Sequence, residues 1–146
     1  MTRKEKRIAR VIALQAIYAY EMAGNSAENA VISIVEGMEK TPAPIVISYA
    51  EALAQLSNNR REDTNKLIVE RLKNWELNRV SIMDKLILRL ALTEMLFEDS
   101  VPPKVSIVEG VEIAKVFSTD DSSRFVNGIL DSVYNDSLKG LIVFEN

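Results

Sequence analysis

Apolar residues recur every three or four positions along almost the whole chain, which is the spacing of an amphipathic α-helix. This pattern predicts a first helix over about 3–22, which Gly24 ends because glycine is favoured just past the last helical turn. Ser26 can cap a second helix through its side-chain oxygen. The segment 41–44 contains two prolines and is expected to be extended, so a third helix begins near Ile45.

The hydrophobic pattern does not decide the secondary structure of every segment. Residues 57–59 are polar and precede a more polar helical stretch that carries Leu67 and Trp75, so the chain forms here either two helices or one bent helix. The segment 74–80 is expected to be a short connection. The apolar residues within 140–146 can either dock on the protein or fray.

Capping patterns predict the helices of the second half. Ser81–x–x–Asp84 resembles a capping box with Asp in place of Glu, and the helix after it is apolar over more than half of its circumference. That helix is therefore expected to be the most buried one. Ser106–x–x–Glu109 is expected to open the next helix, and residues 120–122 the last. No strand is predicted before 140–146, so the fold class is all-α, with about seven helices joined by short loops that favour antiparallel neighbours.

The composition excludes several kinds of chemistry. A chain of 146 residues forms one domain or two closely packed subdomains. It contains no cysteine and no histidine, so disulfides, thiolate zinc sites and the usual general base near neutral pH are excluded. No paired-carboxylate, Gly-rich phosphate-loop or G-x-S-x-G motif is present. We expect no enzyme activity, cofactor or metal. The lack of cysteine, of a signal peptide and of a long apolar run predicts a cytoplasmic protein that does not cross a membrane.

Basic residues gather at the N-terminus, although the chain as a whole is acidic. The first ten residues hold five of the 18 basic side chains and one of the 21 acidic ones, which leaves 13 basic and 20 acidic side chains, a net charge of −7, in the remainder. Positive potential concentrated at one place favours a local phosphate-binding patch. Cations near a helix N-terminus also oppose the helix dipole, and this misplacement favours a functional reason for them.

The first helix is expected to place these cations on one face. With 3.6 residues per turn, that face comprises Arg3, Lys6, Arg7, Arg10, Leu14 and Tyr18. An aromatic ring beyond a row of cations suits single-stranded RNA, because phosphates pair with the charges while an unstacked base lies on the ring. The alternative is that the cations are merely solvated and that Tyr18 belongs to the core.

A second candidate site lies at 118–128. Acidic and serine residues at 120–122 are explained as helix caps that satisfy free N–H groups. Gly128 is not explained in this way, because glycine inside a helix costs about 1 kcal/mol relative to alanine and commonly marks close helix packing.

Several runs of residues, in the first helix and in the second half of the chain, resemble a known family, the bacterial transcription antitermination factors NusB. The shared runs are Leu88–Arg89–Leu90–Ala91–Leu92–x–Glu94–Met95–Leu96, Lys104–Val105–x–Ile107–x–Glu109–x–Val111–Glu112–Ile113–Ala114–Lys115–x–Phe117, and Asp121–Ser122–x–Arg124–Phe125–Val126–Asn127–Gly128–Ile129–Leu130–Asp131. In the first helix, Arg7–x–x–Arg10, Gln15–Ala16 and Tyr18 resemble the family as well. The resemblance is strong over about 74–133 and weak over 25–70.

The resemblance implies an all-α fold of two helical halves, here 1–73 and 74–146, and a non-enzymatic function. Family members bind the boxA element of nascent single-stranded RNA together with NusE (ribosomal protein S-ten), so that the transcription elongation complex resists termination in ribosomal RNA synthesis. The arginine-rich first helix and the start of the last helix form one RNA surface in the family. Carried onto this chain, the RNA-binding residues are Arg3, Lys6, Arg7, Arg10, Gln15, Tyr18, Asp121, Arg124 and Phe125. The implied NusE contacts around the central helix are Asp84, Lys85, Arg89 and Glu94.

This chain departs from the family mainly in its basic segment. The family often has consecutive arginines there, whereas Glu5 and Ile8 interrupt the segment here, so we expect the protein partner to supply part of the RNA affinity. One alternative is a helical protein-interaction module without RNA binding. Another is the NusB-like domain of a ribosomal RNA cytosine methyltransferase, for which this chain offers no cysteine nucleophile and, as we expect, no room for a catalytic domain.

Overall fold

The computed structural model describes residues 1–72 and 79–144, which form seven helices and no strand. Two compact units are distinguished, residues 1–59 and residues 60–146. The all-α prediction is confirmed over the described residues. The predicted boundary between the two halves lies between residues 73 and 74, whereas the boundary between the compact units lies between Asn59 and Arg60. Most of the connection predicted at 74–80, together with Trp75, lies outside the described residues.

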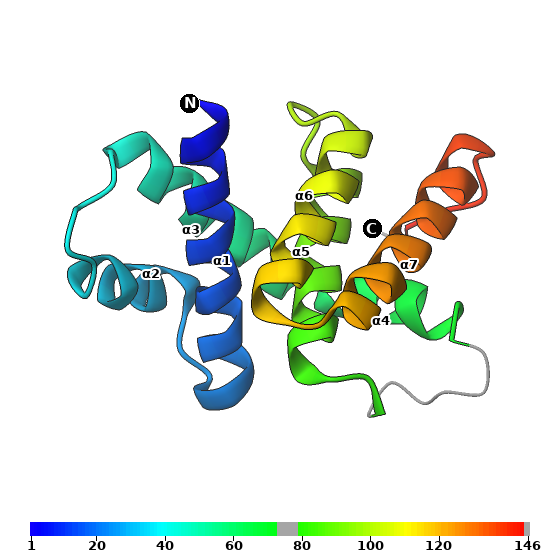
Figure 1. Cartoon of the computed structure of the whole chain (residues 1–146), viewed down its shortest axis with the longest axis horizontal. Coiled ribbons are helices and arrows are strands. Elements are labelled where there is room, and N and C mark those ends of the chain that lie inside the picture. Colours follow the sequence, from blue (N-terminus) through cyan, green and yellow to red (C-terminus); the bar gives the residue numbers. More distant parts are fainter. Residues whose placement is uncertain (73–78, 145–146) are drawn as a thin grey trace. The chain divides into compact units, whose positions relative to one another are not determined.

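The first unit consists of α1 (Arg3–Ala23), α2 (Ala27–Glu36) and α3 (Pro44–Asn59), and α1 packs against both other helices (Figure 1). Gly24 ends α1 in the left-handed conformation, with φ of 71°, and its N–H donates to the Tyr20 carbonyl at 2.8 Å. The Ser26 hydroxyl accepts from the Asn29 N–H at 3.2 Å and caps α2. Both predicted helix boundaries are confirmed.

The chain forms two separate helices around residue 60 rather than one bent helix, which were the two alternatives for this part of the sequence. α3 ends at Asn59, and α4 (Arg61–Val69) begins after Arg60, whose φ of −101° and ψ of 11° are not helical. The Thr64 hydroxyl donates to the Arg60 carbonyl at 3.2 Å and fixes the first turn of α4.

The second unit is built around α5 (Ile82–Phe97), which packs against α4, α6 (Pro103–Phe117) and α7 (Asp120–Leu138). Every residue from Leu86 to Met95 is buried, so the prediction of a central buried helix is confirmed. Gly110 lies where α6 approaches both neighbours. A Cβ atom at Gly110 would lie 3.1 Å from Ala91 Cβ and 3.1 Å from Leu130 Cδ1.

The predicted capping box at Ser106 is wrong. α6 begins at Pro103, because proline fits the first helical position, where its missing N–H needs no partner. Ser106 and Glu109 are therefore buried inside α6 rather than placed at its start. The Ser106 hydroxyl donates to Glu94 Oε1 at 3.1 Å and links α6 to α5.

The described part of the C-terminal segment docks through one aromatic ring. Phe144 packs on Phe97 with ring centroids 4.8 Å apart, and the Arg60 guanidinium lies 4.3 Å from the Phe97 ring centroid. Leu141 and Val143 are exposed. None of the described helices is both long and apolar enough to cross a membrane.

Candidate nucleic-acid interface

The helix that carries the basic segment begins with a reciprocal capping box. The Thr2 hydroxyl accepts from the Glu5 N–H at 3.0 Å, and the Thr2 N–H donates to Glu5 Oε1 at 2.9 Å. The backbone hydrogen bond from Thr2, followed by a side-chain hydrogen bond with the same residue, lowers the pKa of the Glu5 carboxyl. Glu5 therefore caps α1. The Thr2–x–x–Glu5 spacing is the sequence feature that could have revealed this role.

The exposed face of α1 differs from the predicted one. Arg3, Arg7, Gln15 and Tyr18 are exposed, and Lys6 is half-buried. Arg10 is buried, with 3% of its surface exposed, and Leu14 is buried as well. The expectation that Leu14 shares the exposed face is wrong, because the stripe that Arg3 and Arg7 begin at the surface is buried from residue 10 through residue 17.

The start of α7 presents the second group of predicted residues. Thr119 caps the helix by accepting from the Ser122 N–H at 3.1 Å. Asp121 and Arg124 form an ion pair on the surface, with 89% and 76% of their side chains exposed. Phe125, one residue further on, is half-buried. The first turns of α7 therefore offer an aromatic ring beside a paired cation.

Asp84 holds the start of α7 in place. Its carboxylate accepts from the Ser118 hydroxyl at 3.0 Å and from the Ser122 hydroxyl at 2.9 Å. Its backbone N–H donates to Ser81 Oγ at 3.2 Å, so Ser81 caps α5 as predicted, while the carboxylate serves the segment before α7. Asp84 is 7% exposed. The residue predicted as a partner contact is thus part of the internal support for the α7 start.

Two other predicted partner contacts are buried too. Arg89 is 1% exposed and Glu94 is 2% exposed, both within α5. Lys85 is half-buried and is the most accessible of the four residues that the resemblance assigned to NusE.

A cavity of about 1110 Å³ lies within the second unit, beside the start of α7. All three predicted residues of α7 line it. The described lining comprises Glu70, Arg71, Leu72, Arg79, Val80, Ser81, Asp84, Asp121, Ser122, Arg124, Phe125, Gly128, Ile129, Ser132 and Asp136. The lining residues of α7 recur at spacings of three and four between positions 121 and 136, so they lie on one face of the helix. Sequence reasoning named only the first part of that stripe.

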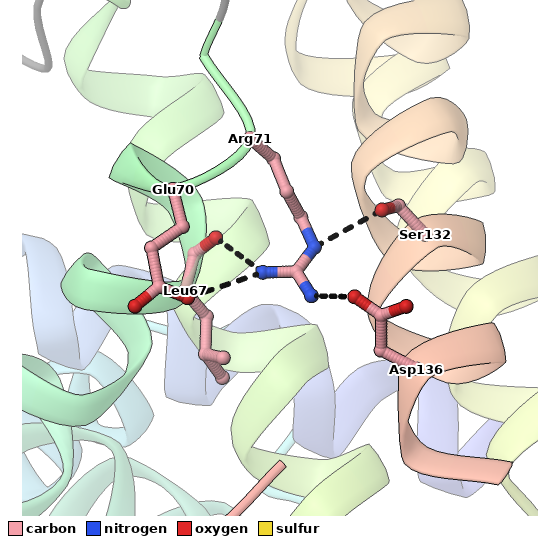
Figure 2. Close-up of polar contacts among 5 residues, drawn as sticks. All are labelled: Leu67, Glu70, Arg71, Ser132 and Asp136. Atoms are coloured by element: carbon pink, nitrogen blue, oxygen red, sulfur yellow. Dashed lines mark hydrogen bonds and ion pairs between the residues drawn. The ribbon is translucent and has the colours of Figure 1, made fainter. Parts of the chain in front are cut away.

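Arg71 lines this cavity and was not predicted. Figure 2 shows its polar contacts. Its Nη1 donates to the Leu67 carbonyl at 2.9 Å, its Nε to Ser132 Oγ at 3.1 Å, and its Nη2 to Asp136 Oδ2 at 2.5 Å. The guanidinium therefore joins the end of α4 to α7, with Glu70 at 3.8 Å on the same side. This wall of the cavity is fixed in position.

Comparison with known proteins identifies the family. The NusB family model matches residues 7–135 of this chain. The chain belongs to the NusB family. The transcription antitermination protein NusB of Chloroherpeton thalassium is 41% identical, over 90% of this chain and 62% of that protein. The NusB of Symbiobacterium thermophilum is 38% identical, over 88% of each chain. The resemblance read from the sequence is confirmed.

A solved NusB structure shows the same fold. The chain matches a crystal structure of the antitermination factors NusB and NusE in complex with double-stranded RNA, with a TM-score of 0.81 at 22% identity. The match covers 92% of this chain and 98% of that chain. This similarity extends the NusB assignment from the sequence to the helical architecture.

Proposed function

We propose that this NusB family member is a non-enzymatic transcription antitermination factor that binds boxA-like single-stranded RNA together with NusE in the cytoplasm. Both curated relatives are named as transcription antitermination proteins, and the structural neighbour was solved with NusE and RNA. In this proposal, the protein acts as part of the transcription elongation complex.

The observation that carries the proposal is the group of side chains at the start of α7. Arg124 is exposed, Phe125 is half-buried beside it, and both line the cavity of the second unit. A cation that pairs with phosphate beside a ring that stacks on a base is the combination that single-stranded RNA requires. Asp84 and its two serine donors keep this group in one position.

The accessible residues of α1 supply the other contacts. In our proposal Arg3, Lys6 and Arg7 pair with phosphates, while Gln15 and Tyr18 meet a base. Arg10 is buried, so we assign it a supporting role beneath this face rather than a phosphate contact. That α1 and α7 share one RNA surface remains a prediction from the family resemblance. For NusE, Lys85 is the candidate contact on α5.

The test is a titration of labelled boxA RNA at several salt concentrations, with and without NusE. With about four phosphate contacts, the slope of log affinity against log salt is expected near −3, which means a loss of about fifty-fold between about 50 and about 200 mM salt. Absent or salt-insensitive RNA binding, with NusE binding retained, would instead favour a protein-interaction module without RNA binding.

A further inference from the structure

The chain leaves the end of α7 in a fixed direction. Gly140 adopts the left-handed conformation, with φ of 70°, and the Leu141 N–H donates to the Asp136 carbonyl at 3.0 Å. The Gly140 N–H donates to the Ser137 carbonyl at 3.1 Å, which completes a Schellman motif. The Asp136 carboxylate is itself held by Arg71. The segment that follows Gly140 is therefore anchored firmly where it begins.

The side chains of the segment 141–144 alternate between two environments. Ile142 and Phe144 are half-buried, whereas Leu141 and Val143 are 67% and 83% exposed. A period of two is the pattern of an extended segment, in which successive side chains point to opposite sides. Among the described residues, the last three of this segment make no backbone hydrogen bond. Beyond Leu141 the segment is therefore held by the side chains of its inner side alone.

The inner side contacts a ring that also carries a cation. The Phe144 and Phe97 ring centroids lie 4.8 Å apart, with the rings tilted by 50°. The Arg60 guanidinium lies 4.3 Å from the Phe97 ring centroid, and its Nη1 pairs with Asp63 Oδ2 at 3.3 Å. An aromatic pair and a cation–π contact are each weak compared with the stability of a folded unit. The end of the segment is thus held more weakly than its beginning.

Arg60 is the residue at which the chain passes from α3 to α4. The second compact unit begins there, and the Arg60 backbone is not helical. Its carbonyl accepts from the Thr64 N–H at 3.0 Å and from the Thr64 hydroxyl at 3.2 Å, which fixes the first turn of α4. Since the Arg60 guanidinium rests on Phe97, the position of that ring affects the connection between the two helices.

We propose that residues 141–144 form a strap that closes over Phe97, stabilises the connection between α3 and α4 at Arg60, and opens without unfolding of the second unit. In the closed state Phe144 keeps the Phe97 ring in the orientation on which the Arg60 guanidinium rests. In the open state the ring loses this support, and the first turn of α4 becomes more mobile. Local opening of this kind is expected where few contacts hold an exposed segment.

The first test follows amide hydrogen exchange in Phe144→Ala and in the control Val143→Ala. Val143 is the neighbouring residue on the outer side of the strap, so its truncation leaves the ring contact in place. We expect Phe144→Ala to speed exchange of the Thr64 amide about fivefold, the size expected for the loss of one aromatic pair. Val143→Ala should leave that rate unchanged. In both variants the amides of Leu86–Met95 should exchange as in the wild type.

A second measurement observes the strap in the unsubstituted protein. The chain contains four phenylalanines, so labelling with para-fluorophenylalanine gives four fluorine NMR signals, which single substitutions assign. On warming below the melting temperature, the Phe144 signal should move toward that of the free amino acid before the signals of Phe117 and Phe125 do. In Phe144→Ala the Phe97 signal should shift, because it loses the neighbouring ring, while the other two stay in place.

The outcomes decide the inference without any RNA, so its failure leaves the proposed function standing. Unchanged exchange of the Thr64 amide in Phe144→Ala would show that the strap does not stabilise the connection. Equal effects of Phe144→Ala and Val143→Ala would exclude the ring contact as the cause. If the Phe144 signal moves only together with the others at the melting temperature, or if exchange at Leu86–Met95 rises as much as at Thr64, the segment belongs to the core and the strap is wrong.

Discussion

Arg71 and Asp136 are joined by an ion pair that ties the end of α4 to the last turns of α7, with Nη2 and Oδ2 2.5 Å apart (Figure 2). The Arg71 side chain is 11% exposed and uses its remaining donors on the Leu67 carbonyl and on Ser132. The two residues are 65 positions apart in the sequence, and their pairing gives the cavity a rigid wall.

Removal of this clamp should destabilise the second unit. Arg71→Ala leaves Asp136 and the Leu67 carbonyl without their donor, and a largely buried charged hydrogen-bond network of this kind is worth about 2 kcal/mol of unfolding free energy. Urea unfolding measures the loss. The control is Glu70→Gln, because Glu70 is 50% exposed and lies 3.8 Å from the same guanidinium, so its effect should stay below about 0.5 kcal/mol. Equal effects of the two substitutions would contradict the clamp.

The resemblance assigned Asp121 to the RNA contacts, but its ion pair with Arg124 leads us to expect that Asp121 limits RNA binding. In the free protein Arg124 is engaged by Asp121, so Asp121→Asn should release the cation for phosphate and raise the affinity for boxA RNA about twofold to fivefold, the range of an exposed ion pair. Fluorescence anisotropy measures the change. Asp120→Asn is the matched control, because it removes the same charge from the same turn of α7 without touching that pair. If both substitutions raise affinity equally, general electrostatics rather than the ion pair is responsible.

Gly110 should tolerate no side chain. Gly110→Ala forces a methyl group to within 3.1 Å of both Ala91 Cβ and Leu130 Cδ1, and overpacking of this kind destabilises by about 1–3 kcal/mol. Thermal unfolding should show a clear drop in melting temperature. A melting temperature at or above the wild-type value would mean that α5, α6 and α7 are less closely packed than described.

The cap of α1 should depend on pH through Glu5. A carboxyl whose pKa is lower in the folded chain stabilises the fold above its unfolded pKa, 4.5 here, and loses that contribution as pH falls through the lowered value. Glu5→Gln should therefore melt earlier than the wild type at about pH 7, and the difference should shrink at about pH 3. Glu39→Gln, on an exposed residue outside the helices, provides the control. A difference that persists unchanged at low pH would exclude the charged cap.

The helices could be predicted from the sequence because each carries its own local pattern. Gly24 and Ser26 mark boundaries that depend only on neighbouring residues, and the structure has them where the sequence put them. Ser106 was misread because its spacing to Glu109 imitates a cap, while the proline at 103 starts the helix one turn earlier.

The site could be predicted only in part, because it depends on partners distant in the sequence. Arg124 and Phe125 were named from the family resemblance, and the structure finds them on the wall of a cavity. The roles of Arg71 and Asp84 could not be predicted, since their hydrogen-bond partners lie on α7 or just before it. The burial of Arg10 likewise depends on packing, which a helical projection of charges does not contain.

The most direct test of the central claim is the affinity of boxA RNA for Arg7→Ala, Phe125→Ala and the control Lys139→Ala, each measured with and without NusE. Arg7 and Phe125 lie on the proposed RNA-binding faces of α1 and α7, whereas Lys139 is an exposed cation at the far end of α7. We predict that Arg7→Ala lowers the affinity and reduces the salt slope by about 0.7, that Phe125→Ala lowers the affinity about tenfold, and that Lys139→Ala changes neither. Wild-type affinity for both Arg7→Ala and Phe125→Ala, alone and with NusE, would contradict RNA binding by these faces.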